Sequence, residues 1–252
     1  MIASWWAAVA MLTRLPARSA AGDRVGSSWF GVAGGLVGAG GLVPLVVLGA
    51  VMPAAAAILA VGIMAVLSGA LHLDGLADSA DALLAIGPGA AERARKDPSI
   101  GVGGATALAL VLGLEVVSLA TLASVQGALI AGLACLVGGS ASRAAPVIVA
   151  WAVRSRAIGV GLGAAFARQV TAADAVVATL TALAVASSAV VIACSPVLLI
   201  GPAVGLAAGV ALGLGVVWLR RQLDGDGLGA TVELSFAAIV LSTAAIGRWP
   251  AA

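Results

Sequence analysis

The sequence predicts an all-α, polytopic integral membrane protein: a bundle of about seven transmembrane helices with an interfacial helix at the N-terminus. Two observations support this class. Of 252 residues, 62% are hydrophobic and only 10% are charged, whereas about a quarter of the residues in a soluble domain are charged. Several apolar runs also approach the roughly 20 residues that cross a bilayer core. No linker divides the chain, so residues 1–252 are expected to form a single membrane-embedded domain.

The elements follow in order from the apolar pattern. Residues 1–12 contain Trp5 and Trp6 but no charged side chain, which is typical of a helix that lies in or dips into the membrane interface. The following runs predict spans at residues 29–52, 53–72, 104–124, 126–150, 173–194, 196–219 and 232–246, the last of them short. Glycines are dense inside these spans, and small residues let helix backbones approach closely within a membrane.

Charged residues gather in every second connection between the predicted spans. The turns near residues 52–53, 124–126 and 195–196 carry no charge, whereas the alternate connections contain all basic residues except Arg143 and Arg248. Because Lys and Arg accumulate in cytoplasmic loops, we expect a multi-pass protein of the cytoplasmic (inner) membrane with its polar end facing the cytoplasm. The net charge of +2, without interleaved aromatic residues, argues against binding of nucleic acid.

The most informative stretch is LHLDGLADSADALL, residues 71–84, which contains three aspartates and the only histidine of the chain. In a helix, Asp74, Asp78 and Asp81 would lie within about 60 degrees of one another around the axis. Like charges at this spacing repel, and no basic residue lies between them. Oxygen ligands select hard cations, so the stretch predicts a site for Mg²⁺ or Mn²⁺. The alternative is a solvated, acidic helix start.

Two later stretches have the composition of phosphate-binding turns. ERARKDPSIGVGG (92–104) joins basic side chains and Asp97 to a glycine-rich turn at the start of a span. DGDGLGATVE (224–233) places two aspartates and three glycines at the start of another. Helix N-termini flanked by glycine can offer backbone N–H groups to phosphate. Each turn alone is a weak signal, because basic residues are expected at cytoplasmic helix ends in any case.

Together, four motifs resemble those of one family. HLDGLADSADAL (72–83), KDPSIGVGG (96–104), GDGLGA (225–230) and the early TRLP (13–16) resemble, in the same order, motifs of the cobalamin 5'-phosphate synthase family, also called adenosylcobinamide-GDP ribazoletransferase. The resemblance extends over most of the chain. It implies a membrane enzyme that, with Mg²⁺ as cofactor, transfers the phosphocobinamide group of adenosylcobinamide-GDP to α-ribazole or its 5'-phosphate and releases GMP. The oligomeric state stays open, with a homo-oligomer among the expected forms.

The resemblance also implies roles for individual residues. The implied metal ligands are Asp74, Asp78, Asp81, Asp97 and Asp226. The implied catalytic residues are His72, Asp74, Asp78, Asp81 and Asp97. The implied substrate-binding residues are Arg14, Arg93, Lys96, Gly101 and Gly225. Two positions depart from the family pattern: Ser99 stands where a basic residue is often found, and Asp224 stands where threonine is usual.

The general base stays open at this point. His72 could accept the proton of the attacking hydroxyl, because an unperturbed imidazole titrates near neutral pH. An aspartate could equally take this role, with His72 as a polar residue that hydrogen-bonds to backbone or to aspartate. Away from the motifs, Glu115 and Arg143 each fall inside a predicted span. Ionised groups within membranes usually find partners, so we expect these two residues to pair.

Two other functions compete with this interpretation. CDP-alcohol phosphotransferases also use an Asp-Gly motif, but their hallmark has an arginine after DGxxA, where this chain has Asp78. A cation or solute transporter could bind its substrate at an aspartate cluster, but it would be expected to place ionisable groups near the membrane midplane in paired broken helices. Here charge is concentrated in alternate loops, which favours an enzyme.

Overall fold

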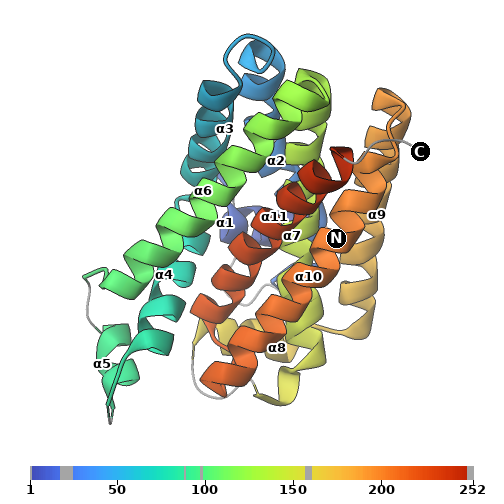
Figure 1. The fold of residues 1–252 in the computed structure, drawn as a ribbon. Helices are drawn as coiled ribbons and strands as arrows, with labels where there is room; N and C mark the ends of the chain where they lie inside the picture. Colours follow the sequence, from blue (N-terminus) through green and yellow to red (C-terminus); the bar gives the residue numbers. More distant parts are fainter. Residues whose placement is uncertain (1, 18–24, 88, 97–98, 157–160, 249–252) are drawn as a thin grey trace.

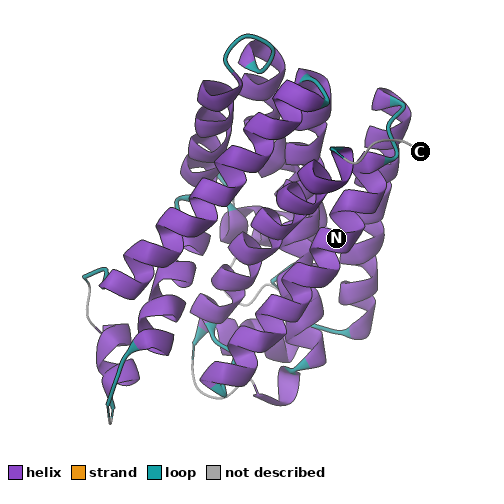
Figure 2. Cartoon of the chain, viewed as in Figure 1, coloured by secondary structure: helices purple, strands orange, loops and turns teal. Residues whose placement is uncertain are grey.

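A computed structural model describes residues 2–17, 25–87, 89–96, 99–156 and 161–248, and within these residues the chain forms helices and loops but no strand (Figure 2). The prediction of an all-α fold is therefore confirmed. The elements are α1 (Ile2–Leu12), η1 (Ser27–Trp29), α2 (Phe30–Leu48), α3 (Pro53–Ser68), α4 (Leu71–Leu84), α5 (Ala90–Lys96), α6 (Val102–Val125), α7 (Ala128–Ala152), η2 (Arg154–Arg156), α8 (Leu162–Gln169), α9 (Ala172–Ala193), α10 (Val197–Arg220) and α11 (Gly225–Gly247).

Among the described residues, six helical segments are long and apolar enough to cross a membrane: the segment Ser27–Leu48, which contains α2, and α6, α7, α9, α10 and α11. The predicted span 53–72 corresponds to α3, which ends at Ser68 and meets α4 at an angle of 93°. The bend arises at Gly69 and Ala70, whose φ angles are 63° and 55°. Their N–H groups donate to Val66 O and Ala65 O, a pattern that commonly ends a helix. The predicted span is therefore shortened to α3, and the described residues contain six spans, or seven if the bent pair of α3 and α4 counts as one, in agreement with the prediction of about seven.

The last span begins earlier than predicted. α11 starts at Gly225, not near residue 232, and it is 23 residues long. The Asp224 side chain accepts a hydrogen bond from Gly227 N at 3.0 Å and so caps the helix. The glycine-rich segment at the start of α11 has a low intrinsic helix propensity. This cap and the contacts with neighbouring helices keep it helical.

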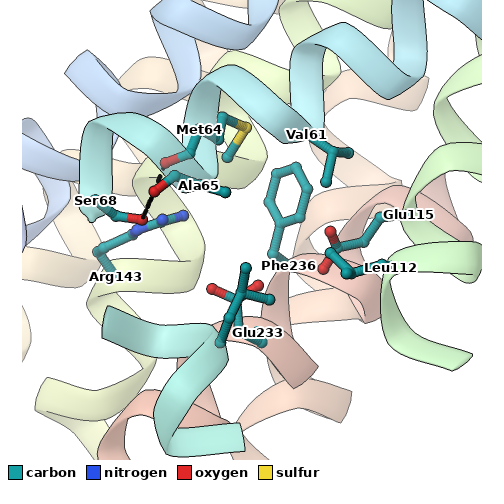
Figure 3. Close-up of a pocket in the computed structure, with 10 residues that line it drawn as sticks. Val61, Met64, Ala65, Ser68, Leu112, Glu115, Arg143, Glu233 and Phe236 are labelled. Atoms are coloured by element: carbon teal, nitrogen blue, oxygen red, sulfur yellow. Dashed lines mark hydrogen bonds between the residues drawn. The ribbon is translucent and has the colours of Figure 1, made fainter. Parts of the chain in front are cut away.

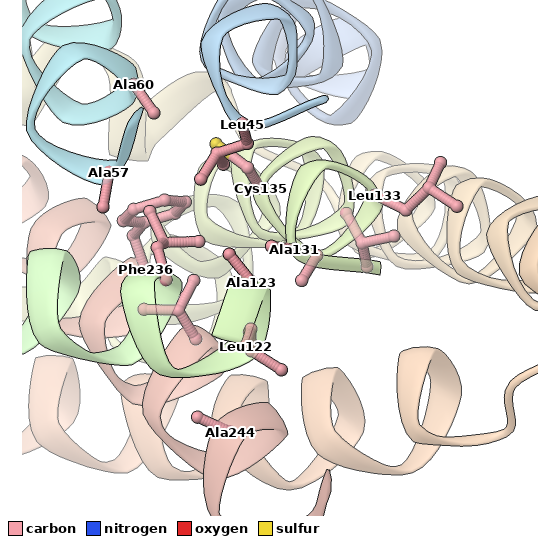
Figure 4. Close-up of a cluster of buried hydrophobic side chains, with 14 of the residues drawn as sticks. Leu45, Ala57, Ala60, Leu122, Ala123, Ala131, Leu133, Cys135, Phe236 and Ala244 are labelled. Carbon is pink, nitrogen blue, oxygen red and sulfur yellow. The ribbon is translucent and has the colours of Figure 1, made fainter. Parts of the chain in front are cut away.

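Rows of small residues set the packing of the bundle. Gly201, Gly205, Gly209 and Gly213 form one row on α10 that faces α11. A Cβ on Gly209 would lie 2.5 Å from Ser235 Cα, so these backbones touch without intervening side chains. Between α2 and α7, a Cβ on Gly139 would lie 2.7 Å from Gly38 Cα. An apolar core that includes Leu45, Leu122, Cys135 and Phe236 lies where the helices meet (Figure 4).

The two ends of the bundle differ in character. α4, α5, α8 and the N-terminal ends of α6 and α11 lie at one end (Figure 1). The turns that join α2 to α3, α6 to α7 and α9 to α10 lie at the other end, and these turns carry no charged residue. The segments that carry the acidic and glycine-rich motifs are therefore collected at one end, as the alternation of charge along the sequence predicts.

Candidate functional site

The TRLP motif lies against the bend between α3 and α4. Arg14 N donates a hydrogen bond to Leu67 O at 2.7 Å, near the end of α3. Thr13 shapes this turn, because its Oγ1 donates to Val9 O at 2.8 Å and accepts from Leu15 N at 3.2 Å. The Arg14 side chain is exposed and crosses Gly69, where a Cβ would lie 2.7 Å from Arg14 Cγ. The motif therefore places an arginine beside the first turn of α4.

A contact between two glycines joins the acidic motif to the last motif. A Cβ on Gly75 of α4 would lie 2.9 Å from Asp226 O and 3.1 Å from Gly229 Cα. Conversely, a Cβ on Gly229 of α11 would lie 3.2 Å from Gly75 Cα. The two helices can touch here only because both residues lack side chains. The contact brings Asp226, in the first turn of α11, next to the aspartates of α4.

The carboxylates of the two helices influence one another at the rim of the bundle. α4 lies outside the six segments that could each span a membrane, and Asp74 is exposed while Asp78 and Asp226 are half-buried. The pKa of Asp78 is raised, first by partial burial and then by the negative charges of Asp74, Asp226 and Asp81, while the nearby Arg220 opposes the rise. Within the described ranges, no three carboxylate, histidine or cysteine groups are close enough to hold a metal ion by themselves.

Asp81 connects the acidic motif to the second motif. Its carboxylate oxygens accept hydrogen bonds from Gly101 N and Gly104 N, each at 2.8 Å. These N–H groups belong to the N-terminus of α6, where an acceptor with negative charge is favoured. In this arrangement the Gly101 N–H is bonded to Asp81 and is not offered to a phosphate. The roles of Asp81 as a metal ligand and of Gly101 as a substrate contact stay predictions.

Arg220, at the end of α10, was not identified from the sequence, although it joins three parts of the site. Its Nη1 donates to Ser79 Oγ on α4 at 2.9 Å and to Asp224 Oδ1 at 2.9 Å. Its Nη2 donates to Asp224 Oδ2 at 2.8 Å and lies 3.6 Å from Asp226 Oδ2. The spacing of Arg220 and Asp224, four residues apart, is a signal that could have indicated this pair. Asp224, the departure from the family's threonine, therefore serves as a helix cap and as the partner of an arginine.

His72 faces the interior of the bundle. It is buried, its backbone lies against Gly229, and its Nδ1 lies 3.9 Å from Glu233 Oε1 on α11. On the helix, His72 and Asp74 are about 200 degrees apart, so the imidazole and the acidic face of α4 point to different sides. The role of His72 as general base stays a prediction.

The second motif is only partly described. Asp97 lies outside the described residues, and so does the side chain of Lys96. Arg93 is exposed on α5, and Gly225 is exposed at the start of α11, where a Cβ would meet no atom within 4 Å. Their predicted roles in substrate and metal binding stay predictions.

The two charges inside the bundle do not form the expected direct pair. Glu115 on α6 and Arg143 on α7 are both buried, and no ion pair joins them in the described part of the chain. They line one cavity together with Glu233 of α11, a residue that was not singled out in the sequence (Figure 3). The sequence shows that Glu115 and Arg143 fall inside predicted spans, where a charged side chain needs a polar partner. Only the packing of the helices decides which residues serve as that partner.

Comparison with known proteins is consistent with this arrangement of motifs. The family model for cobalamin-5-phosphate synthase matches residues 4–244. The adenosylcobinamide-GDP ribazoletransferase of Halorubrum lacusprofundi is 37% identical, over 90% of this chain and 91% of the relative. The proteins of that name from Rhizobium johnstonii and a Nocardioides species are 35% and 34% identical, over 72% and 77% of this chain and 70% and 74% of the relatives. No solved structure matches. Because the family model covers nearly the whole chain, this protein belongs to the cobalamin-5-phosphate synthase family.

Proposed function

We propose that this protein is an adenosylcobinamide-GDP ribazoletransferase, which joins the phosphocobinamide group of its donor to α-ribazole or α-ribazole 5'-phosphate. The observation that carries the proposal is the contact of Gly75 with Gly229, which brings the acidic motif and the GDGLGA motif together at one end of a membrane bundle. The names of the related proteins indicate the reaction. We further propose that the bundle lies in the cytoplasmic membrane with this end facing the cytoplasm, because basic residues collect in the connections there.

The donor atoms of the site fit Mg²⁺. Asp74, Asp78 and Asp226 supply only carboxylate oxygens, which are the ligands that hard divalent cations prefer. The repulsion that raises the pKa of Asp78 is the kind of strain that a cation relieves. Among the described residues no three such ligands lie close together, and the diphosphate of the donor would supply further oxygen ligands. Asp81 and Asp97 are the further ligands implied by the family motifs. When bound, the metal would neutralise the diphosphate and make GMP a better leaving group.

The chain's own residues would orient the two substrates. The acceptor hydroxyl attacks the phosphorus nearer the cobinamide, a new P–O bond forms, and the bond to the GMP oxygen breaks. Arg14, beside the first turn of α4, and Arg93 and Lys96, on α5, are the basic residues proposed to hold phosphate groups. The hydroxyl proton passes to a carboxylate of the cluster or to His72.

The decisive experiment uses the purified full-length protein in detergent, with adenosylcobinamide-GDP, α-ribazole or its phosphate, and Mg²⁺. We expect corrinoid product and GMP in equal amounts, and loss of both on chelation of the metal. Asp74→Asn should abolish the reaction, whereas Asp174→Asn should retain it. Asp174 caps α9 at the same end of the bundle and belongs to none of the four motifs.

A folded protein that forms no product from these substrates would refute the proposal. A CDP-alcohol donor assayed under the same conditions, and ion flux into vesicles that contain the protein, would then test the two alternative functions.

A further inference from the structure

A small polar cavity lies inside the bundle (Figure 3). Its volume is about 20 Å³, and its lining includes the charged residues Glu115, Arg143 and Glu233. These side chains come from α6, α7 and α11, and they are only 1%, 2% and 7% exposed. Arg143 and Glu115 enter from opposite sides, with Glu233 between them (Figure 3). Ionised groups at such positions are costly, and they commonly mark a functional site.

The polar atoms around this cavity are not fully satisfied by protein groups. Arg143 Nη1 donates to Ser142 Oγ at 3.0 Å, but Arg143 Nε and Glu115 Oε1 have no hydrogen-bond partner in the described residues. His72 Nδ1 is also unpartnered, and Glu233 Oε1, at 3.9 Å, is the acidic atom that faces it. A cavity of this volume admits about one water molecule, which could bridge such groups. Glu233 is thus the acidic residue of the cavity lining that also faces His72 of α4.

The contact of Glu233 with His72 joins α11 and α4, the two helices that carry the aspartates. Glu233 and Asp226 are seven residues apart on α11, which is about two turns, so they share one face of the helix. On α4, His72 precedes Asp74 and Asp78. The contact of Gly75 with Gly229 lies between the His72–Glu233 contact and the end of the bundle that carries Asp226. The C-terminal part of α4 is held by Ser79, which bonds to Arg220, and by Asp81, which bonds to the start of α6. At the other end of α4, the His72–Glu233 contact lies deeper than the glycine contact and fixes the direction of this end relative to α11.

We propose that Glu233 is a positioning residue for the transfer reaction: facing His72 and close to Arg143, it sets the spacing between the aspartates of α4 and Asp226. This inference rests on the proposed function where it concerns turnover, but the position of α4 can be measured without any reaction. Residues that orient metal ligands from behind typically change metal affinity by about 10- to 100-fold when altered. Loss of the Glu233 carboxyl group should therefore appear as a changed metal requirement and a looser α4, while the protein remains folded.

The test compares Glu233→Gln with Glu115→Gln in the full-length protein in detergent. Both substitutions replace one carboxyl group of the same cavity by an amide at nearly constant volume, but in the described residues only Glu233 faces a histidine of α4. For Glu233→Gln we expect faster amide hydrogen exchange in residues 71–84 and an increase of about 10-fold or more in the Mg²⁺ concentration for half-maximal turnover. The KM for α-ribazole should stay unchanged. Glu115→Gln should leave α4 exchange and the Mg²⁺ requirement as in the wild type.

Equal effects of the two substitutions, or unchanged exchange of α4 in Glu233→Gln, would overturn the inference. If Glu233→Gln does not fold, His72→Asn removes the same contact from the other helix and should give the same two changes. The double variant of Glu233→Gln and His72→Asn should show no faster exchange of α4 and no higher Mg²⁺ requirement than either single variant. Additive changes in these two quantities would contradict the proposal. A wild-type protein without transferase activity would refute the proposed function, while the exchange comparison would still decide the role of Glu233.

Discussion

A methyl group added at Gly75 would test whether the contact of α4 with α11 builds the site. In Gly75→Ala, the new Cβ would lie 2.9 Å from Asp226 O and 3.1 Å from Gly229 Cα. Ordinary contacts of a Cβ begin near 3.4 Å. The helices would therefore have to separate by about 0.5 Å, because backbone atoms cannot rotate away as a side chain can. Overpacking of this kind costs about 1–3 kcal/mol of stability.

The effect on the reaction should exceed the effect on folding. A displacement of about 1 Å in a catalytic arrangement can lower the rate by about 100-fold, so we expect a loss of about 10-fold or more from half that displacement. The assay is the initial rate of product formation with saturating Mg²⁺, together with the melting temperature in detergent. Gly62→Ala is the matched control, because a Cβ there meets no atom within 4 Å. Wild-type turnover by a folded Gly75→Ala protein would show that this spacing does not control the site.

Three further predictions follow from the site. Asp81→Ala removes the hydrogen bonds that Asp81 accepts from Gly101 N and Gly104 N, so stability should fall by about 1 kcal/mol for each bond lost, measured as a lower melting temperature. An unchanged melting temperature would show that Asp81 does not cap α6. Arg220→Lys keeps the charge but cannot reproduce the paired hydrogen bonds to Asp224, so turnover should fall about 10-fold, while Arg221→Lys at the exposed neighbour should not change it. The pKa of Asp78 is raised in the folded protein, so the fold is more stable with Asp78 protonated than with Asp78 ionised. Without metal, this contribution to stability is complete below the ordinary pKa of 3.8 and is lost as the pH rises through the raised pKa. The stabilisation by Mg²⁺ should accordingly grow across that rise in the wild type but not in Asp78→Asn, which melting curves at several pH values would show.

The acidic motif illustrates how far sequence reasoning reaches. The spacing of Asp74, Asp78 and Asp81 predicts one face of a helix because an α-helix repeats every 3.6 residues, and α4 is such a helix. The same spacing does not reveal that Asp81 caps α6 while Asp78 lies near the negative charge of Asp226. That division depends on where α6 and α11 begin, and both helices begin at glycine-rich turns with weak local preference.

The sequence by itself determined the membrane bundle, the segregation of charge to one end and the identity of the motifs. Hydrophobicity and helical period act over short stretches of chain, and a bilayer requires each spanning segment to satisfy its own backbone hydrogen bonds. Only the tertiary structure decided the bend at Gly69 and Ala70, the link from Arg220 to Ser79 and the meeting of His72 with Glu233. Arg220 and Ser79 are 141 residues apart, and their meeting depends on how glycine-lined helix faces pack, which no local pattern specifies.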